Sequence, residues 1–187
     1  MVIDGNNVKE YPFSQLRKKV GMVPQQAVLF KGTIRDNMKW GKEDASEEEI
    51  QRALSIAQAS GFVKSKPEGL NTMVSQGGAN LSGGQRQRLT IARALVGDPE
   101  ILIMDDSASA LDFATDAALR HAIHEQTKGM TVFIVSQRAT SIKQADKILV
   151  LDDGELAGVG THKELMESCE VYREICLSQL SEQEVNR

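Results

Sequence analysis

The chain has few cysteines and no long apolar segment. Cys169 and Cys176 are its only cysteines; on one helix their separation corresponds to about 10 Å of rise, whereas a disulfide spans at most roughly 7 Å between Cα atoms. We therefore interpret them as reduced thiols of a cytosolic protein. No apolar run approaches the roughly 18 residues of a membrane-spanning helix, and the N-terminus lacks a signal-peptide pattern. A membrane role would therefore depend on a partner or on sequence outside these 187 residues.

An excess of basic charge is also absent. The net charge is -4 and the pI is near 5.5, which argues against a nucleic-acid-binding protein, because such proteins usually carry a basic face. The local basic cluster Arg86-Gln87-Arg88 is interpreted as solvated surface. With 41% hydrophobic and 26% charged residues, the composition is that of one ordinary globular domain.

Three short apolar runs predict buried strands, at residues 20–23, 101–104 and 131–135. They are continuous rather than alternating, which favours strands covered on both faces and hence a parallel sheet between helices. Residues 147–151 and 155–159 flank an Asp-Gly pair and predict a β-hairpin. The fold class is therefore α/β.

Helix starts are marked by capping boxes, in which a Ser or Thr precedes a Glu or Gln by three positions. They predict helices from Ser46 to about Ala59, from Ser82 to Leu95 and from Thr161 to about Glu167. Further helices are expected at 116–126 and 170–180. The polar, helical stretch 33–80 between parts of the sheet resembles an inserted subdomain.

Two segments have the composition of phosphate and metal sites. Ser82-Gly83-Gly84-Gln85 opens a helix, and a helix N-terminus with glycines lets a phosphate approach free backbone N–H groups. Asp105 ends an apolar strand, where a carboxylate can hold Mg²⁺ beside a nucleotide. Each also has a plain structural reading, as a serine-capped glycine loop and as a strand-end Asp that caps the next turn.

Together the two segments are far more specific. The sequence Leu81-Ser82-Gly83-Gly84-Gln85, the strand that ends at Asp105, and Ser109-Ala110-Leu111-Asp112 resemble the signature motif, Walker B and D-loop of ABC-transporter ATPases. Val23-Pro24-Gln25 resembles the Q-loop of ABC exporters, and Gly160-Thr161-His162-Lys163-Glu164-Leu165 resembles the entry to their C-terminal helix. The resemblance covers nearly the whole chain.

The resemblance implies a P-loop NTPase (RecA-like) fold with a mostly parallel sheet and an inserted helical subdomain. It implies ATP and Mg²⁺ as cofactors, with Mg²⁺ near Asp105 and Gln25. It implies that Ser82, Gly83, Gly84 and Gln85 bind a nucleotide held by another chain. The expected D-loop residues are Ser109 and Asp112; Asp112 is expected to contact the opposing site or else to cap the next helix.

Three departures from the family pattern bear on activity. No Gly-x-x-x-x-Gly-Lys-Ser/Thr occurs, so the P-loop and N-terminal strands are missing; the resemblance thus implies a fragment that hydrolyses no ATP alone. Asp106 replaces the usual Glu, and it is shorter by roughly 1.5 Å, which predicts a poor catalytic base. Gln137 replaces the switch histidine and cannot carry a positive charge. Gln25 completes the expected catalytic set.

An intact signature motif beside two altered catalytic positions resembles the degenerate half of a heterodimeric ABC exporter. The implied partners are a second nucleotide-binding subunit and a transmembrane domain, with no nucleic acid. The implied location is the cytoplasmic face of the plasma membrane, the fragment itself being soluble. The expected parts are a first core lobe with the Q-loop (1–32), the helical subdomain (33–95), and the core with Walker B and the switch region (96–187).

Two other functions remain open from the sequence. One is a soluble ABC ATPase of the DNA-repair or chromosome-organising class, although the chain has no heptad run for the long coiled coil of those proteins. The other is a non-hydrolysing interaction module, which would follow from the missing P-loop. The leading function is an ATP-driven export motor subunit.

Overall fold

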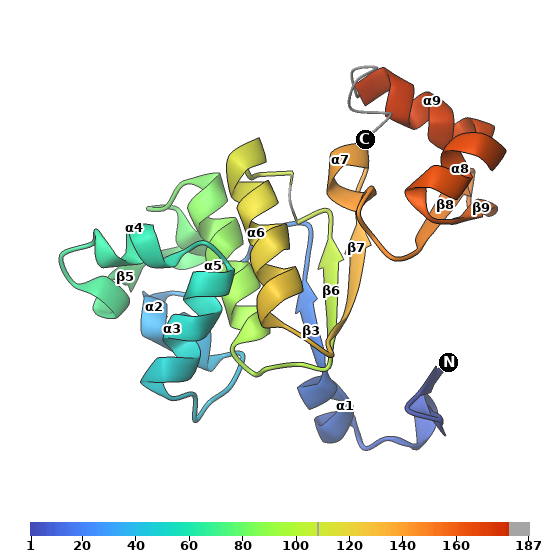
Figure 1. Ribbon diagram of the computed structural model, residues 1–187. Helices are drawn as coiled ribbons and strands as arrows, with labels where there is room; N and C mark the ends of the chain where they lie inside the picture. The colour runs from blue at the N-terminus through green and yellow to red at the C-terminus, as the bar shows by residue number, and fades with distance from the viewer. Residues whose placement is uncertain (108, 180–187) are drawn as a thin grey trace. The chain divides into compact units, whose positions relative to one another are not determined.

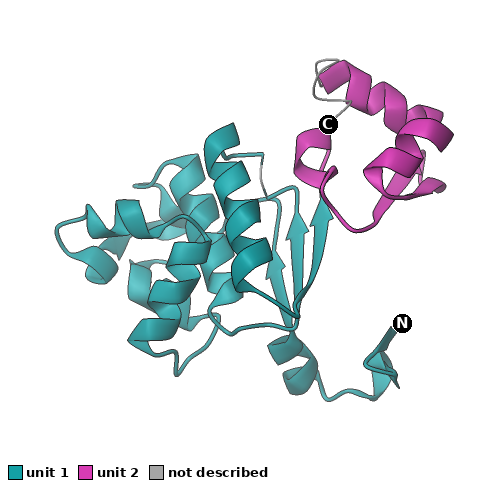
Figure 2. Ribbon diagram, in the orientation of Figure 1, with its two compact units in different colours: residues 1–135 teal, residues 136–187 magenta. Residues whose placement is uncertain are grey.

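The computed structural model describes residues 1–107 and 109–179. The chain divides into two compact units, Met1–Val135 and Ser136–Arg187 (Figure 2). Each unit has a hydrophobic core of its own. The finer division at residues 32 and 95 stays a prediction.

The centre of unit 1 is a parallel sheet of three strands in the order β3-β6-β7. The strands are β3 (Val20–Val23), β6 (Ile101–Asp105) and β7 (Thr131–Val135), so the predicted parallel strands are confirmed. Asp105 ends the middle strand, in register with Val135 on β7. The sheet thereby places the expected Walker B carboxylate at its carboxyl edge, where ligands of open α/β sheets bind.

Helices α5 (Gly83–Leu95) and α6 (Phe113–Gln126) pack on one face of the sheet (Figure 1). Leu89 and Leu119 of these helices share a buried core with Leu102 of β6. The opposite face carries a cross-strand row in which Met22 pairs with Ile103 and Ile103 with Phe133. Met22 is 57% exposed and Phe133 53% exposed. The prediction that both faces are covered is therefore wrong within unit 1, because only the face toward α5 and α6 is packed.

The segment between β3 and β6 forms the expected helical insertion, with a core that includes Ile34, Met38, Ile50 and Leu54. A two-stranded antiparallel pair, which the sequence did not indicate, joins its ends by pairing Gly32 with Val74. The elements are β4 (Gly32–Thr33), α2 (Ile34–Lys39), α3 (Glu47–Ile56), α4 (Ser60–Lys64), η2 (Gly69–Asn71), β5 (Met73–Val74) and η3 (Gln76–Gly78).

The chain before β3 forms only short elements. They are β1 (Val2–Ile3), β2 (Asn6–Asn7), η1 (Val8–Glu10) and α1 (Phe13–Lys19). Lys19 joins this region to the sheet, since its ammonium group lies 3.2 Å from Asp4 and 2.5 Å from Glu100.

Unit 2 is a hairpin packed against helices. It contains α7 (Ala139–Ile142), β8 (Ile148–Asp152), β9 (Glu155–Gly160), α8 (His162–Ser168) and α9 (Glu170–Gln179). The predicted hairpin is confirmed, and its turn residues Asp153 and Gly154 both have positive φ, 47° and 82°, as a two-residue type I′ turn requires. The core of unit 2 includes Val150, Leu165 and Tyr172.

Among the residues that the structure describes, no helix combines the length and the apolarity needed to span a membrane. Within the same part of the chain, no group of three or more His, Cys, Asp or Glu side chains is arranged to hold a metal ion.

Candidate nucleotide site

The first turn of α5 is a complete capping box. The Ser82 hydroxyl oxygen accepts a hydrogen bond from the Gln85 backbone N–H at 3.3 Å, and the Gln85 side-chain oxygen accepts one from the Ser82 N–H at 3.1 Å. Ser82 and Gly83 are exposed. The box fixes the helix start through the Ser82 and Gln85 N–H groups, and it leaves the N–H groups of Gly83 and Gly84 open to an anion from outside.

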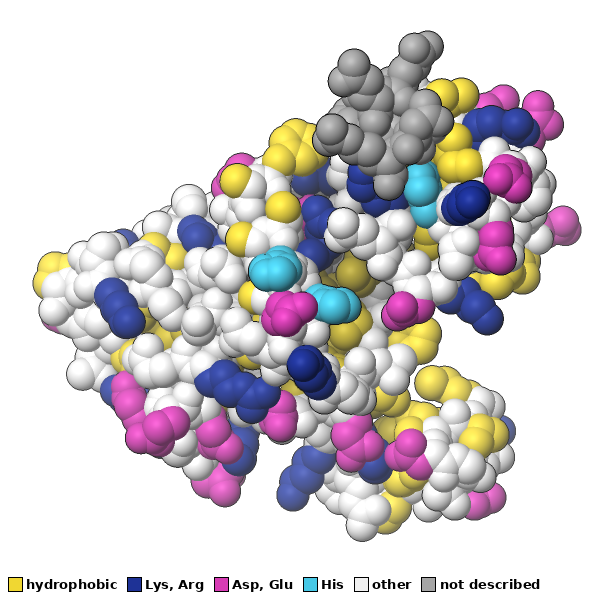
Figure 3. Space-filling view, viewed as in Figure 1, with side chains coloured by type: hydrophobic (Ala, Val, Ile, Leu, Met, Phe, Trp, Pro, Cys, Tyr) yellow, Lys and Arg dark blue, Asp and Glu magenta, His cyan; other side chains and the backbone are white. Residues whose placement is uncertain are grey.

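This helix start differs in charge from the other boxed starts in the described chain. Helices α2, α3 and α8 carry an acidic third residue, namely Asp36, Glu49 and Glu164, and acidic side chains gather at the start of α3 (Figure 3). Helix α5 has the neutral Gln85 there and no acid in its first turn. A carboxylate would offset the partial positive charge of the helix N-terminus, so α5 keeps that charge available for a phosphate.

The pKa values of those carboxyl groups reflect the same contacts. Hydrogen bonds from the Thr33 and Thr161 backbones are the largest cause that lowers the pKa of Asp36 and of Glu164, respectively. For Glu49 the largest cause is the hydrogen bond from Lys42, followed by the Ser46 backbone. In each case the ionised form is stabilised at the helix start.

The two glycines of α5 have different surroundings. A Cβ atom at Gly83 would meet nothing within 4 Å, whereas a Cβ at Gly84 would lie 3.3 Å from the carbonyl oxygen of Ala110. Gly83 therefore leaves space on the open side of the helix start. Gly84 lets the helix approach the segment that contains Ser109 and Asp112.

The basic cluster that follows is not solvated surface, and that interpretation is wrong. Gln87 is buried, with 2% of its surface exposed. Arg86 donates to the Leu81 carbonyl at 2.7 Å. Arg88 donates to the carbonyl of Gln58 at 2.8 Å and to that of Gly84 at 3.3 Å. The arginines tie the helix start to neighbouring turns.

Arg88 contacts the start of α5 and was not singled out from the sequence. Its guanidinium lies 5.0 Å from the centroid of the Phe62 ring, within cation–π range. Desolvation lowers the pKa of Arg88, and the negative charge of Asp112 acts in the opposite direction. The Arg88 guanidinium bonds to backbone carbonyl groups, those of Gly84 and Gln58, so no pairing of side-chain types in the sequence indicated either contact.

The structure brings two of the predicted catalytic residues together. The Gln25 side-chain amide, just after β3, lies with Nε2 3.4 Å from Oδ2 of Asp106, although 81 positions separate them in the sequence. Asp105 lies beside Asp106, and no hydrogen-bond partner of its carboxylate is found among the described residues. By strand alternation Asp105 shares the face of Ile103, away from the packed core.

The backbone of Asp106 has a left-handed conformation, with φ of 41°. Its N–H donates to the Val135 carbonyl at 2.9 Å, and its own carbonyl accepts from the Ser109 hydroxyl at 2.9 Å. Asp tolerates positive φ better than most residues. The turn that holds the carboxylate is thus fixed by β7 on one side and by Ser109 on the other.

Asp112 caps α6. Its carboxylate accepts from the Thr115 N–H at 2.9 Å and from the Thr115 hydroxyl at 2.8 Å, and these bonds lower the pKa of Asp112. The expectation that Asp112 caps the next helix is thus confirmed. Asp112 is also exposed, and its contact with an opposing site stays a prediction.

Gln137 lies in unit 2, in the loop between β7 and α7, and is exposed. Its backbone carbonyl accepts a hydrogen bond from the Gln179 side chain at 2.8 Å. The structure does not bring Gln137 together with other predicted site residues inside one unit.

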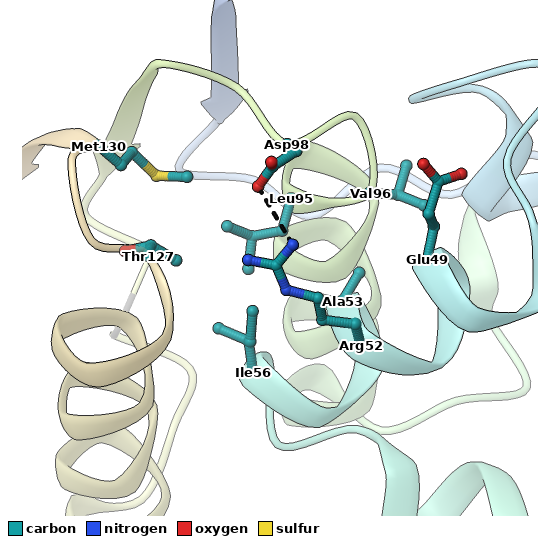
Figure 4. Close-up of a pocket in the computed structure, with 9 residues that line it drawn as sticks. All are labelled: Glu49, Arg52, Ala53, Ile56, Leu95, Val96, Asp98, Thr127 and Met130. Carbon is teal, nitrogen blue, oxygen red and sulfur yellow. Dashed lines mark ion pairs between the residues drawn. The ribbon is translucent and has the colours of Figure 1, made fainter.

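A hollow in unit 1 lies away from these motifs (Figure 4). Arg52 of α3 crosses it to Asp98 at 3.5 Å and donates to the Gln126 carbonyl at 3.0 Å. The hollow has a volume of about 70 Å³, which is far below the roughly 300 Å³ of typical ligand sites. We interpret it as a packing gap between α3 and the end of α6.

The parallel sheet, the carboxylate at its edge and the uncharged, exposed start of α5 are features of a nucleotide-binding domain of mixed α/β architecture. The family model described as ABC transporter matches residues 1–109, which is more than half of the chain. The chain belongs to the ABC transporter ATP-binding family, and its P-loop NTPase fold agrees with that assignment.

Individual relatives support an exporter-type domain. The chain is 47% identical over 177 residues to an uncharacterized ABC transporter ATP-binding protein, YfiB, of Bacillus subtilis, covering 95% of this chain and 30% of that protein. It is 42% identical over 176 residues to an ATP-dependent lipid A-core flippase of Photobacterium profundum, covering 94% and 30%. The chain thus spans about a third of the length of these curated relatives.

A solved structure of a bacterial Atm1-family ABC exporter with ATP bound superposes with a TM-score of 0.91 at 36% identity. The match covers 97% of this chain and 32% of that chain. The match to this exporter therefore extends over residues of both units.

Proposed function

We propose that this chain acts as part of the ATP-binding domain of an ABC exporter, in which ATP binding and hydrolysis drive export across a membrane. The observation that carries the proposal is the start of α5, where the capping box of Ser82 and Gln85 leaves an exposed glycine turn without acidic charge. Such a turn binds phosphate through backbone N–H groups.

In this proposal residues 82–85 complete a nucleotide site on a second subunit. The Ser82 hydroxyl oxygen accepts from Gln85, so its proton is available to a phosphate oxygen. The space beside Gly83 allows close approach of the phosphate. Arg88 would hold the turn in place through the Gly84 carbonyl.

The chain's own nucleotide site is proposed to lie at the carboxyl edge of β6, with Mg²⁺ held by Asp105 and Gln25. Carboxylate and amide oxygens suit Mg²⁺. The carboxylate of Asp105, which has no hydrogen-bond partner among the described residues, fits that role. Gln25 lies against Asp106 through its nitrogen, which leaves its amide oxygen for a cation or a water. Bound Mg²⁺ would neutralise charge on the phosphates.

We further propose that this site holds ATP longer than it hydrolyses it. Asp106 would reach the attacking water poorly, and Gln137 would offer the γ-phosphate a neutral hydrogen-bond donor. A heterodimer partner with Glu after its Walker B Asp and a switch histidine would then carry most of the turnover. Ser109 and Asp112 would contact that partner across the interface.

The remaining partner is a transmembrane domain, which would place the chain at the cytoplasmic face of a membrane. The proposed parts are the Q-loop lobe (1–32), the helical subdomain with the signature helix (33–95) and the Walker B and switch core (96–187). Residues of the inserted helices, of α5 and of β6 share one buried core, so α5 lies between the helical subdomain and the sheet.

The substitution Gln85→Glu tests the proposed role of α5. The carboxylate keeps the capping box, as Glu49 and Glu164 do, so the free energy of unfolding changes by less than about 1 kcal/mol. Its charge repels a phosphate at the helix start. In a complete heterodimeric transporter, ATP turnover at the partner's site is expected to fall about tenfold or more.

Gln15→Glu is the matched control, because Gln15 is exposed and is likewise the third residue of a helix, α1. It adds the same charge at an equivalent position and should leave turnover unchanged. Equal turnover in wild type and Gln85→Glu, with the fold intact, would refute the proposed role of this helix start.

A further inference from the structure

The C-terminal helix of unit 2 holds the loop that contains Gln137. The side-chain amide of Gln179, at the end of α9, donates to the Gln137 carbonyl at 2.8 Å and accepts from the Ala139 N–H at 2.9 Å. One side chain thus binds backbone groups on both sides of Arg138, over a sequence separation of about 40 positions.

These bonds satisfy groups that the loop itself does not satisfy. Arg138 is the N-cap residue of α7, and its side chain makes no cap hydrogen bond. The Ala139 N–H belongs to the first turn of α7, whose N–H groups have no partner within the helix, and Ala139 is fully buried. Losing the acceptor there would leave a buried donor unpaired.

The position of Gln179 is set by the core of unit 2. Tyr172 and Cys176 of α9 are buried, with 1% and 0% of their surface exposed, and pack with Val150 and Leu165. Residues 172, 176 and 179 follow one another at helical spacing and share one face of α9. Packing of that face therefore aims the Gln179 amide at the loop.

The Gln137 side chain remains exposed, whereas its backbone is held. The Arg138 N–H donates to the Ser136 hydroxyl at 3.0 Å, which adds a third bond in the same short segment. No hydrogen-bond partner of the Gln137 side chain is found within the described part of the chain. The side chain is free to meet a ligand from a fixed backbone.

We propose that Gln179 is a positioning residue for Gln137, so that docking of α9 sets the geometry with which residue 137 meets nucleotide. This inference rests on the proposed function, in which Gln137 occupies the position of the switch histidine. It assigns a role to the last turn of α9. The clamp uses both the donor and the acceptor of the Gln179 amide, and neither a carboxylate nor an apolar side chain supplies both.

Amide hydrogen exchange of the 187-residue chain tests the clamp itself. Gln179→Met keeps the length and removes both bonds, and exchange at Ala139 should accelerate about tenfold. Gln179→Glu retains the acceptor for Ala139 but places its carboxylate against the Gln137 carbonyl, so a smaller acceleration is expected. Ser178→Ala is the control, because the side chain of Ser178 donates to the Ile175 carbonyl of its own helix and to no other group of the described chain. Unchanged exchange at Ala139 in Gln179→Met, with β6 amides protected as in wild type, would overturn the clamp.

A double-mutant cycle tests the link to nucleotide. In a complete transporter carrying this chain, ATP dissociation is measured for Gln137→Ala, Gln179→Met and the double variant. If Gln179 acts through Gln137, each single variant accelerates dissociation severalfold and the double variant adds little more. Additive effects, or an effect of Gln137→Ala without one of Gln179→Met, would overturn the positioning role alone. No effect of Gln137→Ala would refute the proposed role of position 137 as well.

Discussion

Asp106 combines a left-handed backbone conformation with a side-chain contact to Gln25. Its left-handed backbone, with φ of 41°, suits Asp better than Glu, and its short carboxylate lies against Gln25 at 3.4 Å. The sequence indicated only the shortened side chain. The structure adds the left-handed backbone of this turn, a conformation in which Asp is enriched among non-glycine residues.

Asp106→Glu is expected to raise ATP turnover at the chain's own site in a complete transporter. A carboxylate longer by roughly 1.5 Å comes within hydrogen-bond reach of an attacking water, and general-base catalysis typically contributes at least about 100-fold. Because Gln137 remains, we expect part of that gain, about tenfold. Steady-state ATPase assays with the partner's site inactivated measure it.

Asp153→Glu provides the matched backbone control, since Asp153 has a similar φ of 47° in the hairpin turn of unit 2. Both substitutions should cost less than about 1 kcal/mol of stability. Turnover that stays at the wild-type level in a stably folded Asp106→Glu transporter would contradict a base-limited site.

At the scale of elements, helix starts are set by local capping chemistry. The boxes at Ser46, Ser82 and Thr161 are confirmed. The box of α2 was missed, because Thr33 is followed by Asp36 rather than by Glu or Gln. Helix α6 begins at Phe113, earlier than the expected residue 116, because Asp112 caps it.

Helix ends depend more on neighbouring elements. Helix α3 was expected to continue to Ala59, but it ends at Ile56. Gln58 adopts a positive φ of 56°, and its carbonyl accepts a hydrogen bond from Arg88 of α5. A residue 30 positions away thus helps to stabilise the turn that ends the helix.

Close packing between α2 and α5 predicts that Gly41→Ala is strongly destabilising. A Cβ at Gly41 would overlap the Arg93 carbonyl oxygen and lie 2.6 Å from the Val96 side chain. Overpacking of this kind costs roughly 1–3 kcal/mol or more. Urea unfolding of the chain, followed by circular dichroism, measures the change.

Gly61→Ala is the opposite case. Gly61 lies in α4, and a Cβ there would meet nothing within 4 Å. The substitution should stabilise by roughly 0.5–1 kcal/mol, because Ala loses less backbone entropy than Gly in a helix. Similar shifts of the urea midpoint for Gly41→Ala and Gly61→Ala would contradict the packing of α2 on α5.

At the scale of the whole molecule, unit 1 leaves several large hydrophobic side chains exposed. One face of the β3-β6-β7 sheet carries the row Met22, Ile103 and Phe133, of which Met22 and Phe133 are more than half exposed. Exposed contiguous apolar surface promotes association. The chain alone is therefore expected to be marginally stable and prone to bind hydrophobic dyes.

Phe133→Thr should lower binding of a hydrophobic dye such as ANS while changing the free energy of unfolding by less than about 0.5 kcal/mol, as is usual for exposed positions. Leu102→Thr, on the buried face of the same sheet with 0% exposure, should cost roughly 2–5 kcal/mol. Dye fluorescence and urea unfolding of the chain check both. A large stability loss for Phe133→Thr would mean that this face is covered in solution, and light scattering would then show whether a second copy covers it.

The sequence by itself determined the family resemblance, the parallel strands, the hairpin and three capped helices. The strands, the hairpin and the capped helices depend on residues within a few positions of one another, where strand pattern and capping chemistry act. The resemblance rests on several such motifs along the chain. Ser82, Gln85 and Asp105 are candidates from their places at a helix start and a strand end, whereas Asp106 is a candidate only through the family resemblance.

Only the tertiary structure decided how those local pieces constrain one another. The burial of Gln87, the bond from Arg88 to Gln58 and the clamp of Gln179 on the Gln137 loop join segments far apart in the chain. Such contacts form only after the chain has folded back on itself, so neither periodicity nor capping can predict them. The exposure of one sheet face was likewise visible only in the structure. An apolar run indicates that burial is favourable, but the elements packed against the strand determine whether its side chains are buried.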